Sequence, residues 1–354
     1  MTNSGLEGVV VADTAISDVD GERGRLVIAG ADVEQLAPVT SFEAAVGLVL
    51  AAGSAAPAAG ITPAAIGAAR AAAWELVPRL GDALDHPDGM DALRTALGHL
   101  RATGAAAGDA VAVIGAAPVF VAAWSRRRAG QPAIAPDPSR GHAADYLRMT
   151  LGHAPAADAV RALDAYLVTV IDHAMCASTF TARVIASTQS DLISAIVGAV
   201  GALKGPLHGG APGPVLDMLD AIGAPGNAEA WLLGELAAGR RIMGMGHRVY
   251  RVRDPRAAVL EEAVRPLASP RLERARGVEQ AAAKILRDRK PDRQLAANVE
   301  FYTAVLLDAV GLPREQFAAT FAVSRIAGWS AHVIEQYRTG RLIRPASNYT
   351  GAMP

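Results

Sequence analysis

Two histidines set among glycines carry the strongest chemical signal in this 354-residue sequence. His208 lies within Gly205-Pro206-Leu207-His208-Gly209-Gly210, and His247 follows Met243-Gly244-Met245-Gly246. Glycine lets the backbone take positive φ and lets a bulky ligand come close. A single histidine of this kind is usually only a turn residue. Two of them, followed further on by the isolated acid Glu300, indicate a site.

These residue types suit a reaction that removes a proton from carbon. A neutral imidazole donates a hydrogen bond to a carbonyl oxygen that gains negative charge, and a carboxylate accepts the departing proton. His208, His247 and Glu300 therefore predict an enolisation followed by carbon–carbon bond formation, provided that the fold brings their turns together. For Glu300 a simpler interpretation stays open, which is an acid in the first turn of a helix, where the dipole favours the charged form.

Three arginines indicate an anionic ligand. Arg256 follows the helix-start signal Asp254-Pro255, Arg325 lies inside an apolar run, and Arg344 precedes a proline. A buried, unpaired charge is costly, and an arginine fork binds a carboxylate through two hydrogen bonds. A substrate with two carboxylates accounts for several of these arginines together, and a structural ion pair is the alternative for Arg325.

The composition predicts that helices position these residues. The sequence is 51% hydrophobic but only 5% aromatic, and alanine, the best helix former, occurs throughout. We expect an all-α fold of one large domain or two unequal ones. A small β-hairpin is expected near the N-terminus, where Val9-Val10-Val11 and Leu26-Val27-Ile28 flank a turn signal at Asp18-Val19-Asp20-Gly21.

Helix boundaries lie beside the candidate residues. An apolar run over 192–203 predicts a buried helix that ends just before the His208 turn and gives it a rigid mount. Asp254-Pro255 predicts the start of another helix, and Asn298 predicts the N-cap of a helix that carries Glu300 in its first turn.

Charge and cysteine content narrow the class of protein. The net charge is −1, without a long basic or acidic run, which argues against a nucleic-acid partner or an anionic membrane surface. The one cysteine, Cys176, excludes an internal disulfide and fits a reducing cytoplasm. The N-terminus lacks a signal-peptide pattern, and the apolar segment 110–124 is too short to span a bilayer. We therefore expect a cytoplasmic protein.

Six stretches of the chain form a recognisable series. They are Gly5-Leu6-Glu7-Gly8-Val9-Val10, Ala177-Ser178-Thr179-Phe180-Thr181-Ala182-Arg183, Leu203-Lys204-Gly205-Pro206-Leu207-His208-Gly209-Gly210, Gly244-Met245-Gly246-His247-Arg248-Val249-Tyr250 through Asp254-Pro255-Arg256, Asn298-Val299-Glu300-Phe301-Tyr302, and Val323-Ser324-Arg325 through Arg344-Pro345. In this order they resemble the citrate synthase family, including its 2-methylcitrate synthase branch. The resemblance covers nearly the whole chain, and the combined motifs are highly specific.

The resemblance implies an all-α homodimer whose large and small domains close over the substrates. His208 would hydrogen-bond the thioester carbonyl of acetyl-CoA, Glu300 would remove the methyl proton, and His247 would polarise the ketone of oxaloacetate. The residues implied to hold oxaloacetate are His173, Arg256, Arg325 and, from the other subunit, Arg344.

The resemblance also implies a division of the chain and a place for the co-substrate. The large domain would comprise residues 1–210 and 312–354, with a small domain of residues 211–311 inserted between them. Acyl-CoA would be the co-substrate, with no permanently bound cofactor and no metal. The residues expected to contact CoA are Met243, Gly244, Met245, Gly246, Arg251 and Asn298.

The sequence departs from the family pattern at several positions. Glu300 stands where the family's usual base is an aspartate, one methylene shorter. After His173 the family commonly has an acid and, two residues later, an asparagine, where this chain has Ala174 and Cys176. We interpret Cys176 as a small buried filler, with a redox-sensitive thiol as the alternative. An aromatic and arginine-containing stretch of the family is replaced by Ile28-Ala29-Gly30-Ala31.

Several functions remain open at this point. The first is a citrate synthase-type acyltransferase that condenses acetyl-CoA with oxaloacetate, and the second is a 2-methylcitrate synthase that uses propionyl-CoA. A catalytically weak paralogue that acts as a binding or regulatory protein is a third interpretation, motivated by the departures at Ala174 and Cys176. A citryl-CoA lyase would use the same residues for the reverse cleavage.

Overall fold

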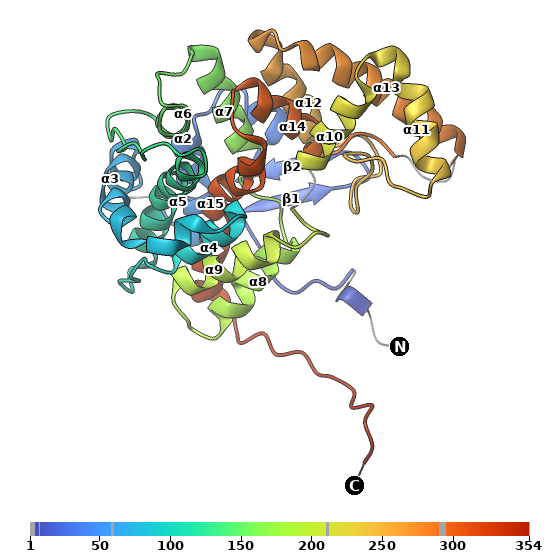
Figure 1. Ribbon diagram of the computed structural model, residues 1–354. Helices are drawn as coiled ribbons and strands as arrows, with labels where there is room; N and C mark the ends of the chain where they lie inside the picture. The colour runs from blue at the N-terminus through green and yellow to red at the C-terminus, as the bar shows by residue number, and fades with distance from the viewer. Residues whose placement is uncertain (1–3, 7, 58–59, 210–211, 290–294, 354) are drawn as a thin grey trace.

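The computed structural model describes residues 4–6, 8–57, 60–209, 212–289 and 295–353. Within these ranges, 15 α-helices and one small three-stranded sheet form the fold, so the predicted all-α class is confirmed (Figure 1). The helices are α1 (Val33–Leu36), α2 (Phe42–Ser54), α3 (Pro63–Trp74), α4 (Gly89–Leu97), α5 (Ala106–Arg128), α6 (His142–Leu151), α7 (Ala157–Thr169), α8 (Ala177–Ser187), α9 (Leu192–Leu203), α10 (Pro212–Ile222), α11 (Ala228–Ala237), α12 (Pro255–Val264), α13 (Pro270–Arg289), α14 (Val299–Ala309) and α15 (Phe317–Thr339).

The sheet near the N-terminus differs in detail from the predicted hairpin. Strands β1 (Ser17–Asp20), β2 (Arg25–Ile28) and β3 (Ala31–Asp32) pair antiparallel in that order. Residues 18–20, expected in a turn, belong to β1, and the turn follows them. The run at 9–11 is not a strand: Val10 is 85% exposed, because no second apolar surface covers it.

The two long helices α5 and α15 form much of the core in the larger group of helices, which comprises α2 to α9 and α15. Nearly all of α15 is buried, and it packs against α2, α5 and α8. Helix α5 has 23 residues, longer than the apolar segment recognised in the sequence, and by length and composition it could cross a membrane. However, 72% of its most apolar window is buried inside the protein, which is the environment of a core helix.

A close approach of α15 positions the chain before His173. A Cβ at Gly328 would overlap the carbonyl of Ile171 and the side chain of Asp172, so only glycine allows this contact. Asp172 is fully buried and accepts hydrogen bonds from Ser17 Oγ at 2.5 Å and from His332 Nε2 at 3.2 Å. This network ties β1 and α15 to the segment that bears His173.

Helices α10 to α14 gather on one side of the molecule, at the upper right of Figure 1. Helix α12 packs against α14 and also against α7 of the larger group. As predicted, Asn298 caps α14, since its Oδ1 accepts from Glu300 N at 3.0 Å. The boundaries 211 and 311 proposed for a small domain stay a prediction.

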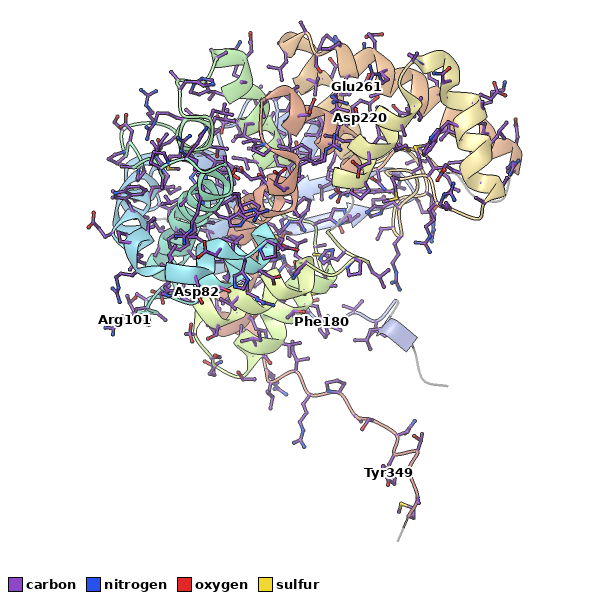
Figure 2. The ribbon with its side chains drawn as sticks, viewed as in Figure 1. Asp82, Arg101, Phe180, Asp220, Glu261 and Tyr349 are labelled. Carbon is purple, nitrogen blue, oxygen red and sulfur yellow. The ribbon has the colours of Figure 1, made fainter. Side chains whose placement is uncertain are left out.

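The chain after α15 leaves the helical body. Residues 340–353 form no helix, and the side chain of Tyr349 stands clear of the folded part (Figures 1 and 2). Three large apolar side chains of this segment are exposed, namely Leu342, Tyr349 and Met353. An extended segment with exposed apolar side chains is suited to contact another surface.

Candidate active site

One cleft of about 1560 Å³ collects most of the candidate residues. It is lined by the turn that follows α9, the starts of α8 and α14, the chain over 239–249, and α15. The predicted residues that line it are His173, His208, Met243, Gly244, Met245, Gly246, His247, Arg256, Asn298, Glu300 and Arg325. The fold thus brings together turns that are far apart in the sequence. Gly210 of the first motif and Glu7 of the N-terminal motif lie outside the described residues.

His208 is held through its Nε2 atom by the start of α8. The backbone N–H of Ser178 points at Nε2 across 3.3 Å, and Ser178 Oγ lies 2.8 Å from the same nitrogen. A backbone N–H only donates, so Nε2 is an acceptor and a neutral His208 carries its proton on Nδ1. Trp329 Nε1 donates to Ser178 Oγ at 3.2 Å and fixes that hydroxyl in turn.

His247 is held through its other ring nitrogen, Nδ1. That atom accepts hydrogen bonds from the backbone N–H groups of Val249 at 3.0 Å and Tyr250 at 3.1 Å. The ring proton therefore lies on Nε2, which faces Arg256 Nη2 at 3.5 Å. Burial and the positive charge of Arg256 lower the pKa of His247 to about 4, so the ring is neutral at neutral pH.

Glu300 occupies the first turn of α14 and points into the cleft. Burial raises the pKa of its carboxyl group to about 7, although the charges of Arg256, His208 and Arg325 oppose this shift. The expectation that the helix dipole would favour the charged form is corrected, because desolvation outweighs the positive groups around it. Among the described residues, Glu300 Oε2 is buried without a hydrogen-bond partner. A carboxyl group with a pKa near 7 suits a general base at neutral pH.

Asp254 connects the arginine of α12 to the helix of the acid. Its carboxylate accepts from Arg256 Nε at 3.0 Å and from Arg256 Nη2 at 2.7 Å, and both side chains are almost fully buried. Asp254 Oδ2 also accepts from the backbone N–H of Val299 at 3.1 Å. Arg256 and Glu300 are thereby fixed relative to each other.

Arg325 lies on α15, and the residue is only 1% exposed. Its Nε donates to the carbonyl of Val170 at 2.7 Å, and Nη1 donates to Cys176 Sγ at 3.6 Å. No described residue pairs with Nη2. The structural ion pair considered for this residue is therefore not formed with a carboxylate among the described residues, and its buried Nη2 group remains without a hydrogen-bond partner.

His173 completes the oxaloacetate set expected within one chain. Its Nε2 lies 3.2 Å from the hydroxyl of Tyr250, and its ring centroid lies 5.5 Å from that of His247. Burial and the charge of Arg256 hold the pKa of His173 well below its usual value, which makes this ring neutral as well.

The glycine-spaced segment 243–246 is fastened to the N-terminus of α14. The carbonyl of Gly244 accepts from Asn298 N at 2.9 Å, and Asn298 Nδ2 donates to the carbonyl of Gly246 at 2.7 Å. Gly244 has a φ of +72°, and a Cβ there would come within 2.9 Å of the Phe301 ring. The segment therefore requires glycine at this position and moves with the helix of Glu300.

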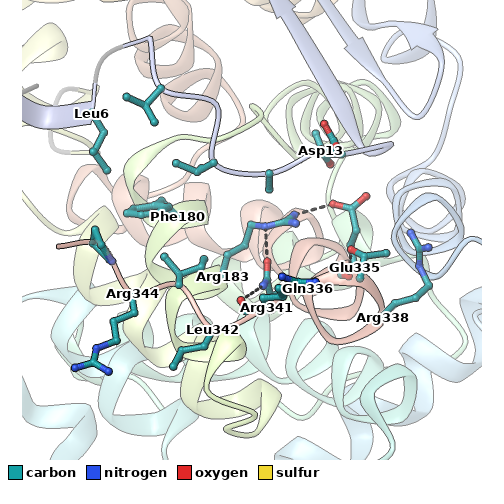
Figure 3. A pocket seen from close by; sticks show the side chains of 18 of the residues that line it. Leu6, Asp13, Phe180, Arg183, Glu335, Gln336, Arg338, Arg341, Leu342 and Arg344 are labelled. Atoms are coloured by element: carbon teal, nitrogen blue, oxygen red, sulfur yellow. Dashed lines mark hydrogen bonds and ion pairs between the residues drawn. The ribbon is translucent and has the colours of Figure 1, made fainter.

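Two predicted residues lie outside the cleft. Arg251 donates its backbone N–H to Gly21, and its side chain lies 3.8 Å from Glu22 Oε1. Arg344 lines a second pocket of about 860 Å³ between the N-terminal and C-terminal segments, and its side chain points away from Arg183 (Figure 3). Within one chain, Arg344 is therefore not brought to the other candidate residues.

Several residues in or next to the cleft were missed by the sequence analysis. Ser178 and Tyr250 lie inside recognised motifs, but their contacts with the histidines depend on tertiary packing. Arginines that line the cleft but were not predicted to do so are Arg240, Arg241, Arg248 and Arg289. The adjacent arginines at 240 and 241, just before the glycine-spaced segment, were the available signal. Among the described residues, no group of three or more His, Cys, Asp or Glu side chains is placed to hold a metal ion.

Comparison with known proteins shows the family of this chain. The family model described as "Citrate synthase, C-terminal domain" matches residues 5–346. A Mycobacterium tuberculosis protein named as a candidate citrate synthase 2 is 52% identical over 195 residues. That match covers 55% of this chain and 52% of the relative, so the chain spans about half the length of this relative.

Longer matches bear two different names. Citrate synthase of Deinococcus radiodurans is 36% identical over 98% of this chain and 95% of its own length. The 2-methylcitrate synthase of Mycobacterium tuberculosis is 37% identical over 98% of this chain and 90% of its own length.

A solved structure resembles the whole fold. It is the ternary complex of Thermoplasma acidophilum citrate synthase with carboxymethyl coenzyme A and oxaloacetate. It superposes with a TM-score of 0.87 at 26% identity, and the match covers 99% of this chain and 96% of that one. By the family model and the full-length relatives, this chain belongs to the citrate synthase family.

Proposed function

We propose that this protein condenses acetyl-CoA with oxaloacetate to give citrate and CoA. The observation that carries the proposal is the meeting of His208, His247 and Glu300 in one cleft with buried arginines. Two N–H donors and one base of matched pKa are what an enolisation next to a thioester carbonyl needs.

Oxaloacetate lies in this proposal between α12 and α15. Its carboxylates pair with Arg256 and with the unpaired Nη2 edge of Arg325, both almost fully buried. His247 donates from Nε2 to the ketone oxygen, and His173 lies beside it, held by Tyr250. The ketone carbon becomes more electrophilic because the hydrogen bond polarises its carbonyl group.

In this proposal acetyl-CoA binds beside the other histidine, His208. His208 donates from Nδ1 to the thioester oxygen while Glu300 removes a proton from the methyl carbon, so the negative charge of the enolate collects on a hydrogen-bonded oxygen. The enolate carbon then attacks the ketone carbon of oxaloacetate, and the ketone oxygen is protonated. Water finally cleaves the citryl thioester and releases CoA as a free thiol.

The segment 243–246 and its neighbouring arginines are proposed to hold CoA. Arg241 and Arg289 line this part of the cleft and supply positive charge for phosphate groups, whereas Arg240 lines it but is paired with Glu235. We propose that residues 211–311 act as a small domain that closes on the larger one. Such closure would exclude water from the enolate.

A homodimer is proposed to complete the site. Arg344 lies on the C-terminal segment that leaves the helical body, and it lines the second pocket rather than the cleft (Figures 1 and 3). Exposed apolar side chains along this segment support its docking on a second copy of the chain. We propose a cytoplasmic location on the single cysteine and the absence of a strongly charged run.

The identity of the acyl group, acetyl or propionyl, is a separate question. Relatives named citrate synthase and 2-methylcitrate synthase match at 36% and 37% identity, so propionyl-CoA is the second candidate. One methyl group in an apolar pocket is worth about 1–3 kcal/mol of discrimination. Product identification by mass spectrometry, with oxaloacetate and each thioester in turn, decides between them.

The expected product is citrate, formed at least tenfold faster than 2-methylcitrate at equal thioester concentration. A faster reaction with propionyl-CoA would reassign the protein to the second branch. A folded protein that binds oxaloacetate but makes neither product would support the binding paralogue and contradict both enzyme functions.

A further inference from the structure

Cys176 lies on the wall of the cleft, which corrects its interpretation as a buried filler. The side chain is partly exposed, and its sulfur lies 3.4 Å from Ser178 Oγ, 3.2 Å from Thr179 Oγ1 and 3.6 Å from Arg325 Nη1. It also occupies the N-cap position of α8, where the helix dipole favours a negative charge. The thiol therefore faces polar and cationic groups.

Arg325 supplies an independent sign that an anion belongs at this point. The residue is 1% exposed and lines the cleft, yet no described residue accepts a hydrogen bond from its Nη2 atom. Its Nη1 atom donates to the sulfur of Cys176. A buried N–H group without a partner marks the position of an anionic ligand group, and Cys176 lies at the neighbouring edge of the same guanidinium.

The surroundings favour the reactive form of the thiol. Burial raises the pKa of Cys176, but a hydrogen bond with His208 and the charge of Arg325 outweigh burial and bring it to about 5. The thiolate is the form that attacks peroxides, and access from a cleft allows the reaction. Both conditions are met in this position.

We propose that Cys176 is an oxidation site for hydrogen peroxide, and that its sulfenic acid closes the cleft to a 2-oxo dicarboxylate. The thiolate sulfur attacks one peroxide oxygen, so that an S–O bond forms while the O–O bond breaks. The departing hydroxide takes a proton and leaves as water; sulfur is oxidised and the peroxide is reduced.

The product has a direct effect on the neighbouring arginine. The added oxygen lies beside Arg325 and competes with a substrate carboxylate for its N–H groups. Loss of synthase activity on oxidation rests on the proposed function, whereas oxidation of the thiol does not. The whole sequence contains one cysteine, so no internal disulfide can form and recovery needs an external thiol.

The test follows the thiol itself in the full-length protein. Hydrogen peroxide is added with and without oxaloacetate, and the oxygen adduct is mapped by mass spectrometry together with the remaining thiol. The result expected is oxidation of Cys176 that saturating oxaloacetate slows at least tenfold. Activity falls in parallel and returns with dithiothreitol.

A matched variant moves the only thiol out of the cleft. It combines Cys176→Ser with Ser54→Cys at the end of α2, a half-buried position that does not line the cleft. The thiol at position 54 is expected to react at least tenfold more slowly than Cys176, with no protection by oxaloacetate. The single variant Cys176→Ser is expected to keep its activity in peroxide.

Two results would overturn the proposal. One is a Cys176 reactivity equal to that of the thiol at position 54, and the other is oxidation that oxaloacetate does not slow. If the double variant does not fold, the protection measured with the native chain still decides. A protein without condensation activity would contradict the proposed function alone, because the mass-spectrometric readout does not depend on turnover.

Discussion

His208 and His247 both present an imidazole N–H to the cleft, but different parts of the molecule hold them. His208 lies in the turn that follows α9, and α8 donates to its Nε2 through the backbone and hydroxyl of Ser178. His247 lies on a loop that donates to its Nδ1 through two of its own backbone N–H groups. The two rings therefore carry their protons on opposite nitrogens.

The difference shows which parts of the site are built as units. The loop of His247 is hydrogen-bonded to Asn298 at the start of α14, so His247 and Glu300 belong to one unit. His208 and Arg325 belong to the other, which α8 and α15 hold together through Ser178 and Trp329. The distance between Glu300 and His208 therefore depends on how the two units are placed relative to each other.

Replacing each histidine with alanine is expected to give the largest kinetic effects and to distinguish the two units. Loss of one N–H donor to a developing oxyanion typically costs about 10²–10³-fold in kcat. We expect such a loss for both His208→Ala and His247→Ala. Only His247→Ala should also raise the KM for oxaloacetate, because its ring contacts the ketone, and steady-state kinetics with each substrate varied measures this.

An equal rise in both variants would contradict the separate roles. The control for each variant is that it keeps its fold near neutral pH, as checked by circular dichroism.

Acidic pH is expected to affect Glu300 and to spare His247, although both belong to the same unit. Because Glu300 has a pKa of about 7 and must be ionised to accept a proton, kcat/KM should fall by about tenfold per unit as pH drops below 7. His247, with a pKa of about 4, stays neutral over the same range and adds no second limb. A pH–rate profile between 5 and 9 measures this.

The same shift makes a prediction for stability. Between about 4.5 and 7 the folded state binds more protons at Glu300 than the unfolded chain does, so its contribution to stability is lost as pH rises. Glu300→Gln should therefore raise the free energy of unfolding at pH 8 more than at pH 5, as measured with urea. An equal gain at both values would contradict the buried carboxyl group.

The hydroxyl of Ser178 is expected to position His208. Ser178→Ala removes one hydrogen bond to Nε2 but keeps the backbone N–H, so a loss of about tenfold in kcat is expected, equal to about 1.4 kcal/mol. Ser194→Ala on α9 is the matched control, since its hydroxyl bonds only to Asp191 at the surface. Equal kinetics in the two variants would exclude the hydroxyl from positioning His208.

Two N-cap variants give the smallest and sharpest comparison. Asn298 caps α14 and Asp191 caps α9 in the same way, so alanine at either should cost about 1 kcal/mol of stability. Only Asn298→Ala also releases the carbonyl of Gly246, so it alone should raise the KM for acetyl-CoA a few-fold. Urea denaturation and steady-state kinetics on both variants check this, and equal KM values would contradict the link.

The sequence was sufficient for features that local chemistry decides. The cap at Asn298, the helix start beside Arg256 and the glycine turns around both histidines follow from side chains close in the chain. Their meeting in one cleft was expected from the order of six motifs. Composition and spacing alone do not fix the distance between turns that lie so far apart.

What the sequence could not show depends on packing. The raised pKa of Glu300 arises from burial, which outweighs the dipole of its own helix. Residues 18–20 form a strand because the apolar Leu26 and Ile28 beside them enter the core, although the residue types favour a turn. Arg251 turns toward Glu22, while arginines nearer the glycine segment line the cleft.

The account depends most on Glu300 acting as the base between the two histidines. The direct measurement is release of free CoA thiol from acetyl-CoA, with and without oxaloacetate, in the native chain and in Glu300→Gln. We predict release that requires oxaloacetate and falls by roughly 10³-fold in the variant. Release without oxaloacetate, or an unchanged rate in Glu300→Gln, would contradict the account.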